Sequence, residues 1–232
     1  MSKPMSSAPI IQRMQAHLRR WEEAGDRRAV FLRCYSMMTE NMLTAVARGE
    51  FQDPVWVNNL LHHFADYYFV ALEAYEQDPA TAPPVWQIAH DCCKSPRLKA
   101  LQNLLLGVNA HINYDLVLAV SDVLQDEWEA LSPQQREVRY ADHCKVNVII
   151  ARTMDSVQDQ VIERYDPEMD LVDKLMGSLD EWLISRLIAS WRDQVWRNAI
   201  DRVVASQAER ALLTQKVEKA CLEIADSILF KR

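Results

Sequence analysis

The sequence predicts an all-α protein, and three observations carry that prediction. Only 4 of the 232 residues are glycine, so hairpins and glycine-rich phosphate loops have little to be built from. Apolar residues recur with helical spacing along most of the chain, and no segment shows the strict alternation of a half-buried strand. Capping residues mark several helix starts. We therefore expect one domain over residues 1–232, a bundle of about eight or nine helices.

Glycine and proline divide the chain into its helical segments. Gly49 and Pro54 interrupt the chain after the second helix, and three of the seven residues from Asp78 to Pro84 are proline. A buried central helix follows, and we expect the others to pack around it. The expected helices span about residues 9–23, 26–48, 55–77, 85–93, 98–129 (the central helix), 133–165, a short segment after 167, 179–204 and 207–230.

Three later helix starts have recognisable caps. Ser132 is followed by Pro133 and Gln135, which suit the first turn and the capping-box position. Ser178 with Glu181, and Ser206 with Glu209, repeat the capping-box spacing. These caps predict where the last three long helices begin.

The composition excludes several classes of protein. Apolar residues make up 49% and charged residues 25% of the chain, as in soluble globular proteins, and the net charge of −7 argues against a nucleic-acid partner. We expect neither a signal peptide nor an integral membrane segment, because no apolar stretch has the required length without polar residues. The five cysteines are interpreted as reduced thiols of a cytoplasmic protein, with residues 1–8 forming a flexible N-terminus.

The most informative stretch is Leu104–Val120, a nearly all-apolar helix with polar residues in its middle. A helix that is apolar on almost every side lies in a protein interior, where each polar group needs a partner. His111 and Asp115 are four residues apart and so share one face of a helix. Gly107, one turn earlier, leaves room beside the imidazole for another helix or for a ligand.

Two interpretations of the His111–Asp115 pair stay open. Imidazole and carboxylate are ligands of first-row divalent metals, and helical bundles often build metal sites from facing helices. In that case the metal is zinc, iron or manganese. The other interpretation is a buried hydrogen-bonded pair that only fixes how the helices pack.

The helix after Pro133 supplies a second set of candidates, Asp142, His143 and Asn147. Antiparallel packing against the central helix would bring Asp142 or His143 toward His111. The alternative is a half-turn that faces solvent. That alternative suits Asn147 less well, because valine and isoleucine flank it.

A third set is His62, His63 and Asp66, in which His62 and Asp66 repeat the four-residue spacing. The helical phase places His63 near the margin of the apolar face, and His62 with Asp66 toward its boundary or the solvent. We interpret them as a solvated pair. A di-iron carboxylate site is unsupported, because it needs Glu-x-x-His on two helices and that motif is absent.

Arginines and tryptophans interleave near the C-terminal end of the chain, at Arg186, Arg192 and Arg197 with Trp182, Trp191 and Trp196. The pattern suggests a cation–π face of structural origin. Binding of an anionic ligand group is the alternative. The final helix carries an apolar side that docks on its own domain or against a second subunit, and docking on its own domain is preferred.

The string NAHINYDL, from Asn109 to Leu116, resembles a hallmark of an uncharacterised all-helical family of bacterial and fungal proteins, a domain of unknown function. The similarity extends to LQNLLLG just before it, to Asp142…Asn147, and to Arg192…Trp196…Ala199. The resemblance implies no activity. It does imply that His111, Asp115, Asp142 and Asn147 belong to one site. Relatives tend to have an aromatic residue where this chain has His143.

These residues lead to a functional hypothesis with one alternative. The hypothesis is an enzyme, in one form a metal-dependent hydrolase, that hydrolyses or rearranges a small, partly apolar substrate. His111 would be a metal ligand or general base, Asp115 its orienting partner or a second ligand, Asp142 the residue that completes the site, and Asn147 a positioning residue. The alternative is a non-catalytic helical protein that binds a ligand or a partner.

Overall fold

All regular secondary structure in the described part of the chain is helical. The computed structural model describes residues 8–157, 160–161, 163–165 and 178–230. The all-α prediction is therefore confirmed. In chain order the elements are α1 (Ala8–Glu23), α2 (Arg28–Ala47), α3 (Pro54–Gln77), the 3₁₀ turn η1 (Pro79–Thr81), α4 (Pro84–Cys93), α5 (Ala100–Asn109), the π-helical turn η2 (Ala110–Asp115), α6 (Leu116–Gln125), α7 (Pro133–Val157), α8 (Glu163–Tyr165), α10 (Ser178–Val204) and α11 (Gln207–Ile228).

Two of the predicted helix caps form as expected. Ser132 Oγ accepts a hydrogen bond from the Gln135 amide at 3.3 Å, and Gln135 Oε1 accepts one from the Ser132 amide at 2.9 Å. Ser206 and Glu209 make the same reciprocal pair at the start of α11. Each cap satisfies amides that would otherwise lack partners in the first turn.

Other expectations about the helices between Pro133 and Glu181 fall partly or wholly outside the described residues. The helix from Pro133 is described to Val157 as α7, and α8 covers Glu163–Tyr165. Residues 158–159 and 162 lie outside the described residues, so a single helix that reaches Tyr165 stays a prediction. The segment expected after Asp166–Pro167 and the side chains of the Ser178–Glu181 cap lie outside the described residues.

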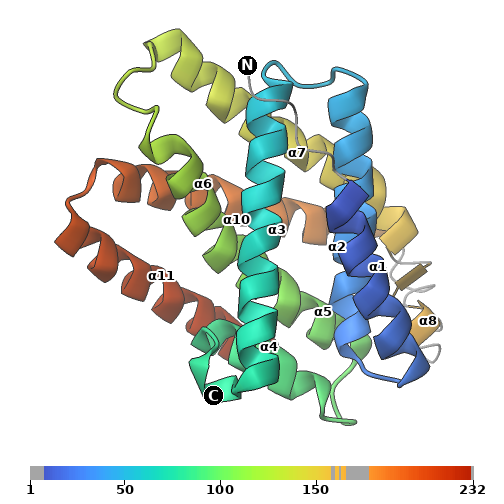
Figure 1. Cartoon of the computed structure of the whole chain (residues 1–232). Coiled ribbons are helices and arrows are strands. Elements are labelled where there is room, and N and C mark those ends of the chain that lie inside the picture. The colour runs from blue at the N-terminus through green and yellow to red at the C-terminus, as the bar shows by residue number, and fades with distance from the viewer. Residues whose placement is uncertain (1–7, 158–159, 162, 166–177, 231–232) are drawn as a thin grey trace.

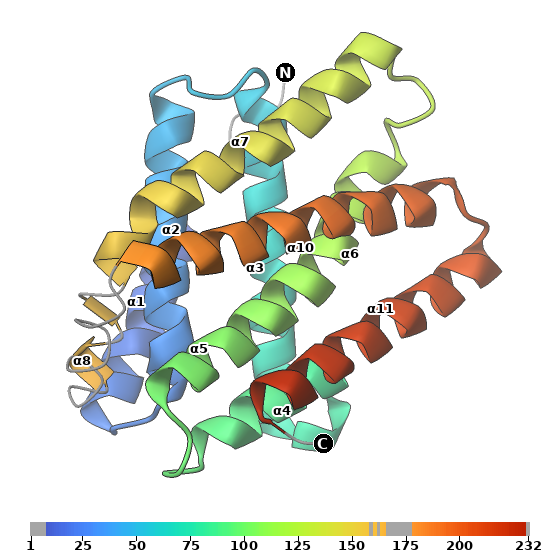
Figure 2. The ribbon, with the colours of Figure 1, turned by 180° about the vertical axis from the view of Figure 1, so that it is seen from behind.

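A central rod, which we define as α5, η2 and α6 in continuous succession, is the element around which the others pack. It covers residues 100–125 rather than the expected 98–129, because residues 126–130 form turns. The α3 helix lies on one side of the rod and α10 on the opposite side (Figures 1 and 2). The rod also contacts α2, α4 and α11. The buried hydrophobic side chains form one cluster, from α1 to α11.

The rod changes its helical form in its middle, which the sequence pattern did not predict. Residues Ala110–Asp115 are π-helical, and the Leu116 amide donates to the His111 carbonyl five residues earlier. A π turn has more residues than an α turn, so it rotates the side chains that follow it relative to those before it. The backbone angles stay close to helical values on both sides, with φ −61° at Asn109 and −67° at Leu116.

The final helix docks on its own domain. Val217, Cys221 and Ala225 of α11 are buried, and α11 contacts α4, α5, η2 and α10. Asn109 fixes this contact, because its Nδ2 donates to the Cys221 carbonyl at 2.9 Å while its Oδ1 accepts from Asn113 Nδ2 at 2.9 Å. The polar side chains of Asn109 and Asn113, in the middle of the apolar stretch, thus have structural roles in the packing of α11 against the central rod.

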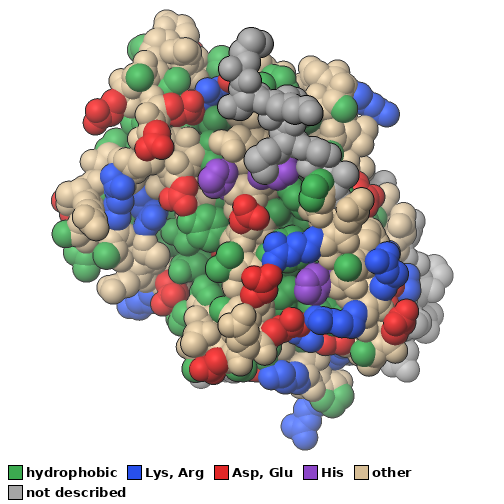
Figure 3. Space-filling view, viewed as in Figure 1, with side chains coloured by type: hydrophobic (Ala, Val, Ile, Leu, Met, Phe, Trp, Pro, Cys, Tyr) green, Lys and Arg blue, Asp and Glu red, His purple; other side chains and the backbone are tan. Residues whose placement is uncertain are grey.

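The central rod is long and apolar enough to cross a membrane by length and composition. Within the molecule, however, 83% of its most apolar window is buried, as in the core helix of a soluble protein. In the described part of the chain this is the one helix that meets the criterion, and its burial is consistent with the expectation of no integral membrane segment. On the face shown in Figure 3, acidic and basic side chains are interspersed among hydrophobic ones.

The rod and α2 approach each other closely at Gly107. A Cβ atom placed on Gly107 would lie 2.4–2.7 Å from three side-chain carbons of Phe31. The room left by the glycine is therefore filled by another helix, which was one of the two expected uses. Phe31 in turn touches the His111 ring edge-on, with centroids 5.7 Å apart.

Gly107→Ala should lower the free energy of unfolding, by up to about 2 kcal/mol. Overpacking against Phe31 costs about 1–3 kcal/mol, which exceeds the gain of about 1 kcal/mol from the better helix propensity of alanine. Urea denaturation measures the difference. Adding Phe31→Leu should recover part of the loss, whereas strictly additive effects of the two substitutions would contradict the close contact.

Candidate functional site

His111 and Asp115 form a buried hydrogen-bonded pair across the π turn. His111 Nδ1 lies 2.9 Å from Asp115 Oδ2, and the two residues are 2% and 1% exposed. The four-residue spacing in the sequence therefore corresponds to a direct contact.

Trp86 of α4 supplies the second partner of Asp115. Its Nε1 donates to both carboxylate oxygens, at 3.1 and 3.0 Å. No lysine or arginine of the described residues pairs with Asp115. Burial therefore raises the pKa of Asp115 well above its usual value, although the Trp86 hydrogen bond opposes this, and burial lowers the pKa of His111 well below its usual value.

Aromatic rings hold the His111 imidazole in place. The Phe64 ring stacks on it with a centroid separation of 3.6 Å and an interplanar angle of 7°, and Tyr35 packs edge-on at 4.3 Å. Phe31, Tyr68 and Trp86 complete this shell. The second ring nitrogen, Nε2, is buried and has no hydrogen-bond partner among the described residues. An unpaired buried nitrogen costs about 1–3 kcal/mol.

Whether His111 Nε2 accepts or donates a hydrogen bond depends on how many protons the His111–Asp115 pair holds. With one proton, the carboxylate is charged, Nδ1–H donates to Asp115, and Nε2 presents a lone pair. With two protons, Nε2 carries a hydrogen and becomes a donor. One proton therefore switches Nε2 between acceptor and donor, which is the behaviour of an acid–base group.

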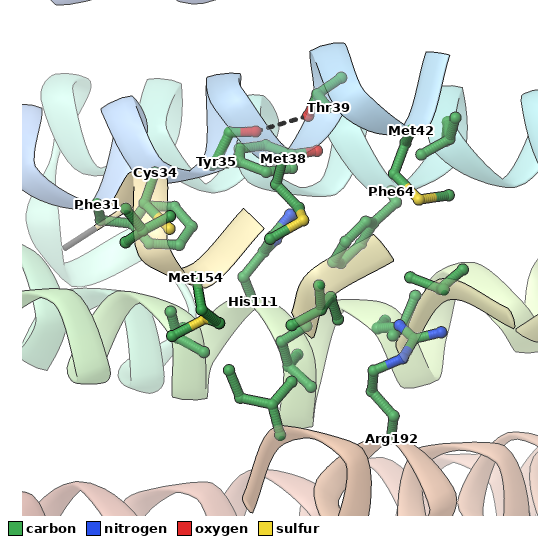
Figure 4. A pocket seen from close by; sticks show the side chains of 18 of the residues that line it. Phe31, Cys34, Tyr35, Met38, Thr39, Met42, Phe64, His111, Met154 and Arg192 are labelled. Carbon is green, nitrogen blue, oxygen red and sulfur yellow. Dashed lines mark hydrogen bonds between the residues drawn. The ribbon is translucent and has the colours of Figure 1, made fainter. Parts of the chain in front are cut away.

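His111 lines a largely apolar cavity of about 380 Å³. Side chains from α2, α3, the central rod, α7 and α10 surround it. Figure 4 shows His111 rising from the rod toward α2, into the space bordered by Tyr35, Met38 and Phe64. The polar or charged side chains of the lining are few, which is typical of a site for a small apolar molecule. Besides Tyr35, they are Thr39, His111, Asp142, His143 and Arg192.

Asp142 lines the same cavity, but its carboxylate has structural partners. Its Oδ1 accepts from the Gln52 amide at 2.8 Å and its Oδ2 from the Asp53 amide at 2.7 Å. Asp53 caps α3 in turn by accepting from the Trp56 amide at 3.0 Å. Asp142 on α7 thereby anchors the turn before α3, the helix that carries Phe64.

Asn147 and His143 hold an arginine that was not among the expected site residues. Arg192 of α10 donates from Nε to Asn147 Oδ1 at 2.8 Å and from Nη2 to the His143 carbonyl at 2.7 Å. The His143 ring lies with Nε2 2.9 Å from the Arg192 carbonyl, and its pKa is lowered, chiefly by burial. The interleaved arginines and tryptophans of the sequence indicated this region. In the structure Arg192 donates hydrogen bonds to Asn147 and His143, and Arg197 pairs with Asp193.

The third candidate set stays outside the cavity. His63 and Asp66 are exposed on α3, whereas His62 is buried. The expectation that His62 lies toward the boundary or solvent is therefore wrong. None of the three lines the cavity.

The described residues bring the candidate ligands only partly together. His111 and Asp115 are in contact, and Asp142 and His111 line one cavity. In the described ranges, no three His, Cys, Asp or Glu side chains gather so that they could hold a metal ion. A metal would have to compete with the hydrogen bonds that Asp115 and Asp142 already accept.

Asp142→Asn should lower the free energy of unfolding by about 2 kcal/mol, because an amide cannot accept both backbone hydrogen bonds and the charge that strengthens them is lost. Denaturant unfolding measures the change. Asp66→Asn, at an exposed position on α3, is the matched control and should stay within about 0.5 kcal/mol. Equal stability of the two variants would show that Asp142 does not anchor the turn.

The chain was compared with curated proteins, with solved structures and with protein-family models. Neither the search of curated proteins nor that of solved structures returned a match for the chain. A protein-family model, described as a family of unknown function (DUF5995), matches residues 8–230. The expected resemblance to an uncharacterised family is thereby confirmed. The chain belongs to this family of unknown function, DUF5995.

Proposed function

We propose that the protein binds a small, largely apolar molecule in the cavity and that His111, oriented by Asp115, transfers a proton to or from that molecule. One observation carries this proposal. His111 is fixed on one edge by Asp115 and on its faces by aromatic rings, while Nε2 has no partner among the described residues. A ligand group at Nε2 would satisfy this nitrogen.

The cavity supports an apolar ligand. Most of its lining consists of leucine, isoleucine, valine, methionine and aromatic side chains, and its volume falls in the range of small-molecule sites. Burial of apolar surface contributes about 25 cal/mol per Å² to such binding. The few polar groups of the lining would then orient the ligand rather than supply most of the affinity.

The arrangement favours rearrangement over hydrolysis. In a rearrangement, Nε2 removes a proton from one atom of the ligand and returns it to another, so the His111–Asp115 pair ends as it began. No second reactant is consumed. Hydrolysis needs a water molecule as nucleophile, and an apolar lining holds water poorly. A positioned imidazole typically contributes about 10²–10⁴-fold to a proton-transfer rate.

Metal-dependent hydrolysis is a separate proposal. Zinc, iron or manganese would use His111 Nε2, with Asp142 as a further ligand after its carboxylate gives up hydrogen bonds to the Gln52 and Asp53 amides. Asp115 lies at the other ring nitrogen, Nδ1, so it would have to leave both His111 and Trp86 before it could ligate the same metal. A bound metal would supply a hydroxide near neutral pH.

The remaining proposals concern location and assembly. A cytoplasmic location is supported by the five free cysteines, and the absence of a nucleic-acid partner by the net charge of −7. Self-association through α11 would have to use exposed side chains such as Leu212, because the buried side of the helix contacts its own domain.

The neutral fluorescent probe N-phenyl-1-naphthylamine should bind in the cavity and gain emission. Val146→Trp, on the part of α7 that lines the cavity, should abolish this gain by filling the space. Val148→Trp, two residues away and 43% exposed, is the matched control and should bind normally.

Nitrogen NMR of histidine-labelled protein should show the His111 Nε2 signal shifting when the probe saturates the wild type, and no such shift in Val146→Trp. Failure of the probe to bind, or equal binding by both tryptophan variants, would contradict the proposal.

Metal analysis separates the two chemistries. Protein purified without a metal-affinity tag should contain no stoichiometric metal if His111 acts with Asp115 alone. Stoichiometric metal that is lost in a folded His111→Ala variant would instead support the metal-dependent enzyme.

A further inference from the structure

Arg192 is a buried cation that forms no ion pair with a described residue. The residue is 4% exposed. Its Nε and Nη2 donate to uncharged acceptors, the Asn147 side chain and the His143 carbonyl. Its third nitrogen, Nη1, donates to no described residue. A buried charge in this situation is expensive, and such charges are normally paired.

Among the described residues that line the cavity, none forms an ion pair with Arg192. Asp142 lines the same cavity, but both of its oxygens accept backbone amides on the side of the α2–α3 turn. Burial lowers the pKa of His143, so this ring is neutral near pH 7 and adds no second cation. Burial also lowers the pKa of Arg192, to about 10, which leaves the guanidinium charged near neutral pH.

Arg192 belongs to the lining of the cavity that His111 enters. Figure 4 shows its side chain rising from α10 toward this space, opposite the side chains of α2. Asn147 and His143 fix two of its three nitrogens, so the guanidinium is held in one orientation before any ligand arrives. Preorganised donors of this kind give affinity because little freedom is lost on binding.

We propose that the ligand of the cavity is a largely apolar monocarboxylate whose carboxylate accepts hydrogen bonds from Arg192 while the rest of the molecule extends along the apolar lining and places its reacting group at His111 Nε2. The inference rests on the proposed function, because it assigns a chemical class to the same occupant. One guanidinium balances one carboxylate charge. A phosphate monoester carries close to two charges near pH 7, and the second would be left uncompensated in an apolar cavity.

Competition with N-phenyl-1-naphthylamine at pH 7.5 tests this class with matched pairs of acid and alcohol. The pairs are decanoate with 1-decanol, and 2-naphthylacetate with 2-(2-naphthyl)ethanol. In the wild type, at least one acid should bind about ten- to a hundredfold more tightly than its alcohol, which is the expected effect of a charge-assisted hydrogen bond.

Variants of Arg192 test whether this residue causes the preference for the acid over the alcohol. Arg192→Met should remove the acid preference and keep the binding of the neutral probe, while Arg192→Lys should retain part of the preference because it keeps the charge. Arg197→Met is the matched control on the same helix, since Arg197 is exposed and pairs with Asp193. It should behave like the wild type.

The outcomes distinguish the two proposals. Probe binding with equal affinity for acid and alcohol would overturn the carboxylate inference and leave an apolar ligand site. An acid preference that persists in Arg192→Met would overturn the role of Arg192. Absence of probe binding in the wild type would overturn the proposed function itself, and the carboxylate inference with it.

Discussion

The buried chain of hydrogen bonds from Trp86 to Asp115 to His111 is the interaction on which the rest of the structure depends. It places a carboxyl group in the middle of the hydrophobic core, where no lysine or arginine of the described residues pairs with it. Such a group is tolerated only when its hydrogen bonds are made, and here they come from α4 and from the rod itself. The relative positions of these elements are therefore restricted by two polar contacts as well as by apolar packing.

The π turn carries the two central residues of these hydrogen bonds, and one of them, His111, lines the cavity. It lies in the segment that contains both His111 and Asp115, and π turns inside α-helices frequently occur at functional sites. The turn keeps the imidazole against the carboxylate on one edge, while the stacked Phe64 ring holds its face. A strained or irregular element in a buried helix is maintained because the surrounding structure determines it.

Some polar residues in and beside the cavity hold the surrounding structure together, and others keep a nitrogen that a ligand could contact. Both carboxylate oxygens of Asp142 accept from the turn before α3, and Asn147, which is not a lining residue, accepts from Arg192 through its Oδ1. His111 and Arg192 each keep one nitrogen that no described residue uses. An imidazole that can change its proton count and a fixed cation, both set in an apolar lining, form a combination suited to recognising an amphipathic acid.

The sequence by itself determined the all-α class, most helix boundaries and the His111–Asp115 pair, because helical periodicity, caps and four-residue spacing are local properties of the chain. It also singled out Asp142 and Asn147, whose roles depend on partners far along the chain. Only the tertiary structure decided that Asp142 anchors a turn and that Asn147 holds Arg192, 45 residues away. The sequence did not single out Trp86, Phe31 or Phe64, which pack against His111 only in the folded structure, because an aromatic residue on a helix carries no local sign of what it will touch.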